Sequence, residues 1–189
     1  IGYQNMKLKI SHSIFLLFFL FFCRESGAND FLNSITLREG LSLDGEWKII
    51  VDPYENGYYN YRYTPFDKDD NPSRSAFFMD SKANSPSDLI EYDFDKAKSL
   101  IVPGDWNTQM EQLYYYEGTV WYQKKFDFSE KENTRTFLYF GAANYKAEVY
   151  LNGKKLGTHI GGFTPFYFEI PALTLPGANS LVVKVANKR

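Results

Sequence analysis

The second half of the chain alternates apolar and polar residues with a period of two. In residues 145–151, Ala147, Val149 and Leu151 alternate with Lys146, Glu148 and Tyr150. This alternation predicts a half-buried β-strand, because successive side chains of a strand point to opposite faces. Asn152 and Gly153 follow directly, and both accept positive φ angles readily. We therefore predict a two-residue hairpin turn, after which residues 155–160 pair back antiparallel.

Similar short runs recur along most of the chain after residue 40. They predict further strands at residues 46–51, 99–102, 119–128, 136–140, 165–170 and 180–186. Gly, Asn and Pro separate the runs, and the only hint of a helical turn lies near residues 87–90. This pattern predicts an all-β fold, an antiparallel β-sandwich of jelly-roll type.

Residues 52–98 interrupt this pattern. The segment is rich in Tyr, Asp, Asn, Ser and Pro and shows little alternation. A stretch of about 45 residues without a strand pattern is long for a connection in a compact domain. We interpret it as an insertion that lies over the sandwich and forms part of a rim.

The first residues of the chain have the order of a signal peptide. Met6 is followed by basic residues and then by the apolar run 14–23. That run is too short for a transmembrane helix, which favours export over an uncleaved anchor. We exclude residues 1–28 from the fold and regard residues 1–5 as untranslated or wrongly assigned. Small residues near position 28 offer a cleavage site, while Cys23 offers an alternative, lipidation, so we expect a periplasmic or extracellular protein.

Composition narrows the classes of function. Cys23 is the only cysteine, so the exported domain has no internal disulfide. The two histidines, His12 and His159, cannot form a metal cluster because His12 belongs to the leader. We accordingly expect no metal and no cofactor. Without the leader the chain has 18 basic and 22 acidic residues, which gives no basic surface for nucleic acid.

Aromatic residues make up 19% of the chain. This content suits an aromatic β-sandwich core, and it also suits stacking surfaces for the CH faces of sugar rings. Composition alone does not separate the two interpretations.

Seven segments, in this order and spacing, resemble the N-terminal sugar-binding domain of glycoside hydrolase family 2, in the β-glucuronidase and β-galactosidase branch. The segments are Leu43–Trp47, Val102–Asn107, Gly118–Tyr122, Phe140–Tyr145, Val149–Gly153, Gly161–Phe166 and Val183–Asn187. The resemblance covers residues 41–189. It implies a galactose-binding-domain-like jelly roll, followed in the whole enzyme by an immunoglobulin-like domain and a (β/α)₈ barrel.

The resemblance also implies what the parent protein does. Such enzymes hydrolyse O-glycosyl bonds of β-linked sugars by a retaining mechanism with two glutamates, which belong to the barrel. We therefore assign no catalytic residue to this chain and expect the domain alone to be inactive. Its expected partners are a β-linked oligosaccharide or glycoside and its own barrel domain, and a homo-oligomeric enzyme is compatible with the resemblance. The chain ends directly after a predicted strand, so we expect missing downstream domains, and the insertion leaves the identity of the sugar open.

The chain's own candidates for chemistry are few. Retaining hydrolysis needs two carboxyl groups about 5 to 5.5 Å apart, and no spacing here predicts such a pair. Asp44 and Asp105 adjoin glycines and are interpreted as turn formers. Weak candidates for ligand binding are Trp106, Tyr116 and Glu117, which lie at strand ends or in loops.

Other distinctive residues have structural interpretations. We expect Trp47 and Trp121 to fill the space between the sheets and His159 to lie on the surface of a strand. Two other classes of function stay open beside the glycosidase, a freestanding carbohydrate-binding module and a structural or adhesive sandwich.

Overall fold

The computed structural model describes residues 39–68, 72–88, 92–129, 133–170 and 177–188. The chain divides into two units, 1–41 and 42–189, and the description below concerns the second. The predicted leader, with Cys23, lies outside the described residues. Within the described ranges, no helix is both long enough and apolar enough to cross a bilayer.

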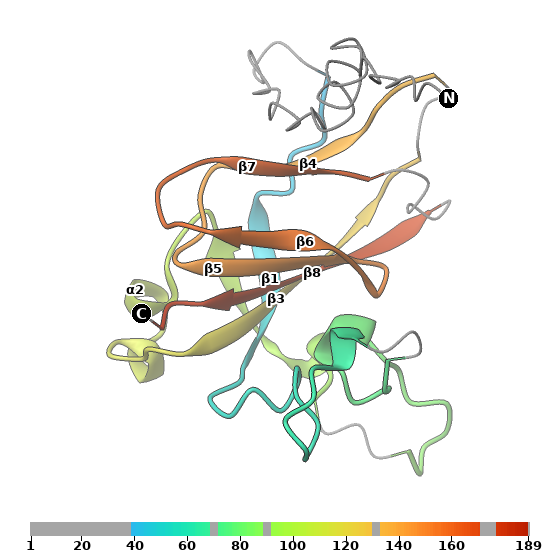
Figure 1. Ribbon diagram of the computed structural model, residues 1–189, viewed down its shortest axis with the longest axis vertical. Helices are drawn as coiled ribbons and strands as arrows, with labels where there is room; N and C mark the ends of the chain where they lie inside the picture. The colour runs from blue at the N-terminus through green and yellow to red at the C-terminus, as the bar shows by residue number, and fades with distance from the viewer. Residues whose placement is uncertain (1–38, 69–71, 89–91, 130–132, 171–176, 189) are drawn as a thin grey trace, which may run out of the picture. The chain divides into compact units, whose positions relative to one another are not determined.

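The described residues contain eight strands in two antiparallel sheets (Figure 1). The strands are β1 (Gly45–Val51), β2 (Lys98–Val102), β3 (Thr119–Asp127), β4 (Phe137–Phe140), β5 (Lys146–Leu151), β6 (Lys154–Ile160), β7 (Phe166–Glu169) and β8 (Ala178–Ala186). The larger sheet has the order β2-β1-β3-β8-β5-β6, and the smaller sheet pairs β4 with β7. The predicted all-β sandwich of jelly-roll type is confirmed.

The turn between β5 and β6 forms as the sequence predicts. Asn152 and Gly153 have φ angles of 49° and 79°, and Leu151 pairs with Lys154 across the turn. The register of the two strands shifts once, between Val149 and Tyr150. The hairpin lies at one side of the larger sheet, where β5 also pairs with β8.

Alternate residues of the larger sheet face the smaller sheet and form an apolar core. Trp47, Val149 and Leu181 belong to this core, together with Leu138 and Phe166 from β4 and β7. The approach is close at β6, where a Cβ atom on Gly157 would lie 2.2 Å from the Phe168 ring. A side chain at position 157 would therefore push the smaller sheet away.

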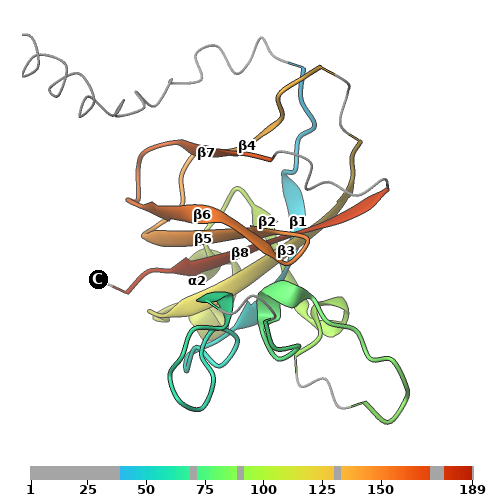
Figure 2. The ribbon, with the colours of Figure 1, turned by 45° about the vertical axis from the view of Figure 1, so that its right-hand side comes forward.

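The opposite face of the larger sheet is covered by the described residues of the insertion, 52–68, 72–88 and 92–97, which lie between β1 and β2 in the chain. The two views agree that the insertion and the β4–β7 pair lie on opposite sides of the larger sheet (Figures 1 and 2). Phe77, Phe78 and Phe94 of the insertion pack there against Trp121 and Tyr150. The expectation that Trp121 lies between the sheets is therefore wrong, whereas Trp47 does lie there. In addition, β5 is not half-buried, because the insertion buries its second face.

Short helical segments complete the described fold. They are α2 (Trp106–Gln109) and the 3-10 helices η2 (Phe66–Lys68), η3 (Phe77–Met79), η4 (Phe94–Lys96) and η5 (Glu111–Leu113). The sequence predicts only a turn where α2 begins. The Asp105 carboxylate accepts a hydrogen bond from the Thr108 backbone N–H at 2.8 Å, which caps the amino end of α2.

Candidate functional site

The candidates Trp106, Tyr116 and Glu117 lie in the connection between β2 and β3, beside the end of β8. The Trp106 side chain is 6% exposed, and its indole N–H donates to the Tyr116 carbonyl at 3.3 Å. The Tyr116 hydroxyl accepts from the backbone N–H of Thr119 at 3.1 Å and donates to its carbonyl at 3.0 Å. Glu117 is exposed. The structure therefore brings Trp106 and Tyr116 together as supports of this loop, and a role in ligand binding stays a prediction for all three.

Four exposed aromatic residues lie in segments linked by hydrogen bonds to the end of β8 or next to such segments. Tyr114, Tyr115, Tyr145 and Phe163 are 58%, 90%, 44% and 93% exposed. Backbone hydrogen bonds hold their segments together: Tyr145 donates to the Ala186 carbonyl, Gly161 to the Tyr145 carbonyl, and Asn187 to the Gly118 carbonyl. We call these four residues the carboxyl-end surface. Their exposure follows from loop geometry, which no local sequence pattern reveals.

The carboxyl groups that the sequence singles out do not form a catalytic pair. Asp105 caps α2, and its hydrogen bonds from Thr108 lower its pKa. Asp44 is exposed just before β1, and Glu117 lies in the loop before β3. His159 is half-buried and stacks on Phe166 with ring centroids 4.1 Å apart. Among the described residues, no group of three His, Cys, Asp or Glu side chains is placed to hold a metal ion.

A buried ionic cluster lies on the insertion side of the larger sheet, and sequence analysis missed it. The Lys184 ammonium contacts Glu148 at 3.2 Å and Glu55 at 3.1 Å, and the Lys184 and Glu148 side chains are 4% and 3% exposed. Lys155 contacts Glu148 at 3.1 Å and also contacts Asp67. We call Glu55, Asp67, Glu148, Lys155 and Lys184 the ionic cluster.

The ionic cluster holds its acidic members in the charged form. Burial alone would raise the pKa of Glu148, but Lys184 and Lys155 outweigh it and lower the pKa. The pKa of Asp67 is lowered against burial as well, because Asp67 accepts hydrogen bonds from Lys155 and from the hydroxyl groups of Tyr58 and Tyr150. Carboxylates with lowered pKa values are poor proton donors, and retaining hydrolysis requires a carboxylic acid that donates a proton. The cluster therefore suits a structural role, the attachment of the insertion to the sheet.

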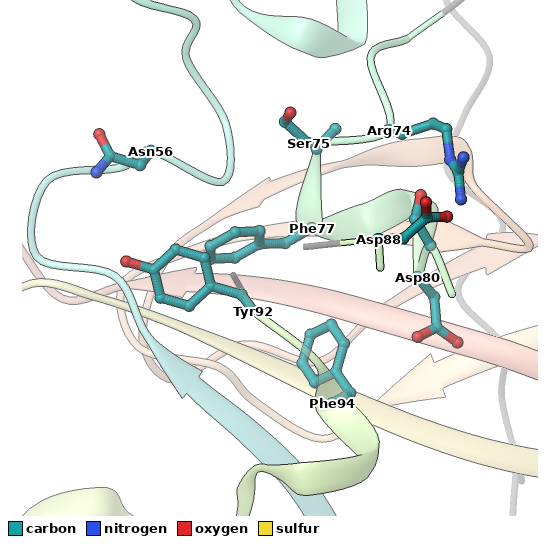
Figure 3. A pocket seen from close by; sticks show the side chains of 10 residues that line it. Asn56, Arg74, Ser75, Phe77, Asp80, Asp88, Tyr92 and Phe94 are labelled. Atoms are coloured by element: carbon teal, nitrogen blue, oxygen red, sulfur yellow. The ribbon is translucent and has the colours of Figure 1, made fainter. Parts of the chain in front are cut away.

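The insertion also contains a pocket of about 390 Å³ (Figure 3). Its floor is aromatic: the ring of Tyr92 packs against that of Phe77 at an angle of 51°, with centroids 4.6 Å apart. Phe77 in turn meets Trp121 of β3 edge-on at 5.7 Å. The pocket is thus built on the sheet through two successive ring contacts, although its residues come from a segment without strand pattern.

Polar groups line the pocket above this floor. Arg74 and Asp88 lie on one side, while Asn56 lies on the other, toward which the Tyr92 hydroxyl points (Figure 3). The Arg74 guanidinium donates to the Lys82 carbonyl at 2.7 Å, which restrains it. An aromatic floor with convergent donors and acceptors is a common arrangement in small-molecule sites. No sequence signal marks this pocket, because its residues are scattered through the insertion.

Comparison with known proteins identifies the family of this chain. Residues 41–189 match the family model of the glycosyl hydrolases family 2 sugar binding domain. The chain is 37% identical over 95 residues to a putative beta-glucuronidase of Formosa agariphila, 35% over 91 residues to a beta-glucuronidase of Paenibacillus borealis, and 31% over 90 residues to a beta-galactosidase of Thermoanaerobacter pseudethanolicus. The aligned regions cover 48%, 47% and 44% of this chain, and 11%, 15% and 12% of those proteins.

Solved structures give the same result. A Bifidobacterium dentium beta-glucuronidase, complexed with coumarin-3-O-glucuronide, matches with a TM-score of 0.54 and 30% identity over 77% of this chain and 20% of its own. The Ruminococcus gnavus beta-glucuronidase matches with a TM-score of 0.58 and 26% identity over 78% of this chain and 21% of its own. The chain therefore spans a fifth or less of the length of four of these five proteins, and 21% of the fifth.

Proposed function

Since the chain belongs to the sugar-binding domain family of the family 2 glycosyl hydrolases, we propose that it is the non-catalytic N-terminal domain of an exported β-glucuronidase. In this proposal the domain braces a catalytic barrel and shapes one wall of its pocket. The two catalytic glutamates belong to that barrel, outside this chain. The leader at residues 1–28 directs the protein to the periplasm or the exterior, with Cys23 as an alternative point of lipid attachment.

The family match over residues 41–189 carries the proposal. The short share of each relative that the chain spans supports the view that catalysis resides elsewhere in the parent enzyme. The two structural neighbours and two of the three relatives are named as beta-glucuronidases, which favours a β-glucuronide over a β-galactoside as the substrate.

The carboxyl-end surface supports the bracing role. Phe163 and Tyr115 each expose most of their area, and a cluster of exposed aromatic side chains is typical of a surface that contacts another protein part. The surface also lies where the chain leaves β8, next to Asn187. A domain that follows Arg189 would therefore start beside it.

The parent gene provides the test. We expect the reading frame to continue past the codon of Arg189 into a barrel with glutamates at strand ends, and the whole protein to hydrolyse 4-nitrophenyl β-D-glucuronide faster than the galactoside. Faster cleavage of the galactoside would change the proposed substrate and leave the bracing role unaffected. A stop codon shortly after Arg189 would contradict the proposal and favour a freestanding carbohydrate-binding module.

A further inference from the structure

The pocket in the insertion has no part in the proposed bracing role. We propose that it binds one neutral sugar unit of a glycan. The inference rests on the floor, the rim and the charge of the pocket, and it holds whether or not the parent protein cleaves glucuronides.

The floor offers a preformed stacking surface. Tyr92 is 38% exposed, so part of its ring faces solvent while the rest packs on Phe77. Phe77 is 7% exposed and is fixed against Trp121, which is fully buried. A pyranose presents an apolar CH face that suits such a ring. Because these contacts already hold the ring in place, little conformational entropy is lost on binding.

The rim supplies both kinds of hydrogen-bonding group. The guanidinium of Arg74 is a donor only, and an ionised carboxylate is an acceptor only. Asp88 is held ionised, since hydrogen bonds from the backbone N–H of Asn84 at 2.8 Å and from the Ser85 hydroxyl at 3.1 Å lower its pKa. Sugar hydroxyls donate and accept, so neighbouring hydroxyls of one ring can satisfy Arg74 and Asp88 together.

The charge of the lining favours a neutral sugar over a uronic acid. Arg74 contributes one positive charge, while Asp80 and Asp88 contribute two negative charges. Lys82 offsets Asp80, which its ammonium contacts at 2.9 Å. The pocket thus has no excess positive charge to attract a uronate carboxylate. Its volume of about 390 Å³ falls within the range of roughly 300–1,000 Å³ that is usual for small-molecule sites.

Binding can be followed residue by residue by NMR on the ¹⁵N-labelled 189-residue chain. Cellobiose, lactose and D-glucuronic acid are added separately up to about 20 mM. This concentration saturates a site whose dissociation constant for the sugar is about 1 mM. We expect at least one neutral disaccharide to shift the amide signals of Arg74, Ser75, Asp88 and Tyr92. Binding of glucuronic acid alone, shifts centred on residues 114–117, or no shift with any probe would overturn the proposal.

Two substitutions and one control sharpen the test. Tyr92→Ala removes the stacking ring and should weaken binding at least about fivefold, and Arg74→Gln should weaken it about tenfold. Tyr54→Ala is the control, since Tyr54 is 82% exposed and does not line the pocket, and its affinity should equal that of the unmodified chain. If Tyr92→Ala disturbs the fold, Arg74→Gln decides, because Arg74 is exposed. Unchanged affinity in Arg74→Gln would refute the site.

Discussion

The two faces of the larger sheet are buried by different means. On the face toward β4 and β7, apolar side chains such as Val149 and Leu181 pack against Leu138 and Phe166 of the smaller sheet. The face toward the insertion combines aromatic rings with buried charges. Three charged residues are buried in the described chain, and all of them make contacts on this face: Asp52, Glu148 and Lys184. Thus strands of one sheet support an apolar layer on one side and an ionic, aromatic layer on the other.

The difference explains how an insertion without strand pattern attaches in one position. Apolar contacts are non-directional, so they tolerate small displacements. Hydrogen bonds and buried ion pairs are directional: the Asp52 carboxylate accepts from the Trp121 indole at 2.9 Å and from the Gly57 backbone N–H at 3.0 Å. Since a buried charge is costly without its partner, the ionic cluster penalises any other placement of the insertion.

The largest effect should come from a single break in the ionic cluster. Lys184→Met leaves Glu148 and Glu55 without their shared ammonium group and should destabilise the domain by about 4 kcal/mol, measured by denaturant unfolding. Lys146→Met is the matched control, because Lys146 also contacts Glu148, at 3.5 Å, but its side chain is 43% exposed. The control should cost under about 1 kcal/mol. Equal losses in both variants would mean that burial does not set the strength of the cluster.

A cavity in the apolar core should cost somewhat less and should not depend on charge. Leu181→Ala removes a fully buried side chain and should destabilise the domain by about 3 kcal/mol. The loss should be the same at low and high salt concentration in urea unfolding. A loss that changes strongly with salt would contradict the separation of the two faces.

Acid should loosen the insertion before the apolar core. The pKa values of Glu55, Asp67 and Glu148 are lowered in the folded protein. In the unfolded chain the same carboxyl groups have pKa values of about 4, and above this pH their contribution to stability is complete. The contribution is lost as the pH falls through the lower pKa values that these groups have in the folded protein. Hydrogen exchange, corrected for intrinsic rates, should show faster opening of residues 52–68 than of β4 between pH 6 and pH 3. Simultaneous opening of both regions would refute this order.

The smallest effect is expected at the surface. Arg135 and Glu169 form a two-point ion pair with distances of 2.8 and 2.9 Å, but the Arg135 side chain is 71% exposed. Arg135→Ala should change the unfolding free energy by no more than about 1 kcal/mol. A loss as large as that of Lys184→Met would show that geometry outweighs burial in this domain.

Sequence patterns predicted one face of the larger sheet well and the other poorly. The period-two alternation of Ala147, Val149 and Leu151 predicts the strand and its apolar face, and the Asn152-Gly153 pair predicts the turn. The same alternation places Glu148 on the exposed face of the strand, and this prediction is wrong. A pattern within one strand does not show what covers that strand. In the structure Glu148 lies opposite Lys184 on β8, and the insertion covers both. The opposite charges were visible in the sequence, but their pairing depends on strand order, which a local pattern does not encode.

The candidate sites show the same limit. The sequence singles out Trp106 at a strand end and Tyr116 in a loop, and the structure places them together in one connection. The pocket was not predicted, because Arg74, Phe77, Asp88 and Tyr92 share no spacing that indicates a motif. The packing of Phe77 and Phe78 on Trp121 and Tyr150 brings this part of the insertion to the sheet, and these contacts are not encoded in any local pattern.

The central claim is that this domain supports catalysis without performing it, and an assay of the purified 189-residue chain tests it most directly. The chain is incubated with 4-nitrophenyl β-D-glucuronide and 4-nitrophenyl β-D-galactoside, and release of nitrophenol is compared with a blank. The account predicts no release above the blank at any protein concentration. Release of nitrophenol that rises in proportion to the concentration of the chain, and that disappears in a Glu117→Gln variant, would contradict it.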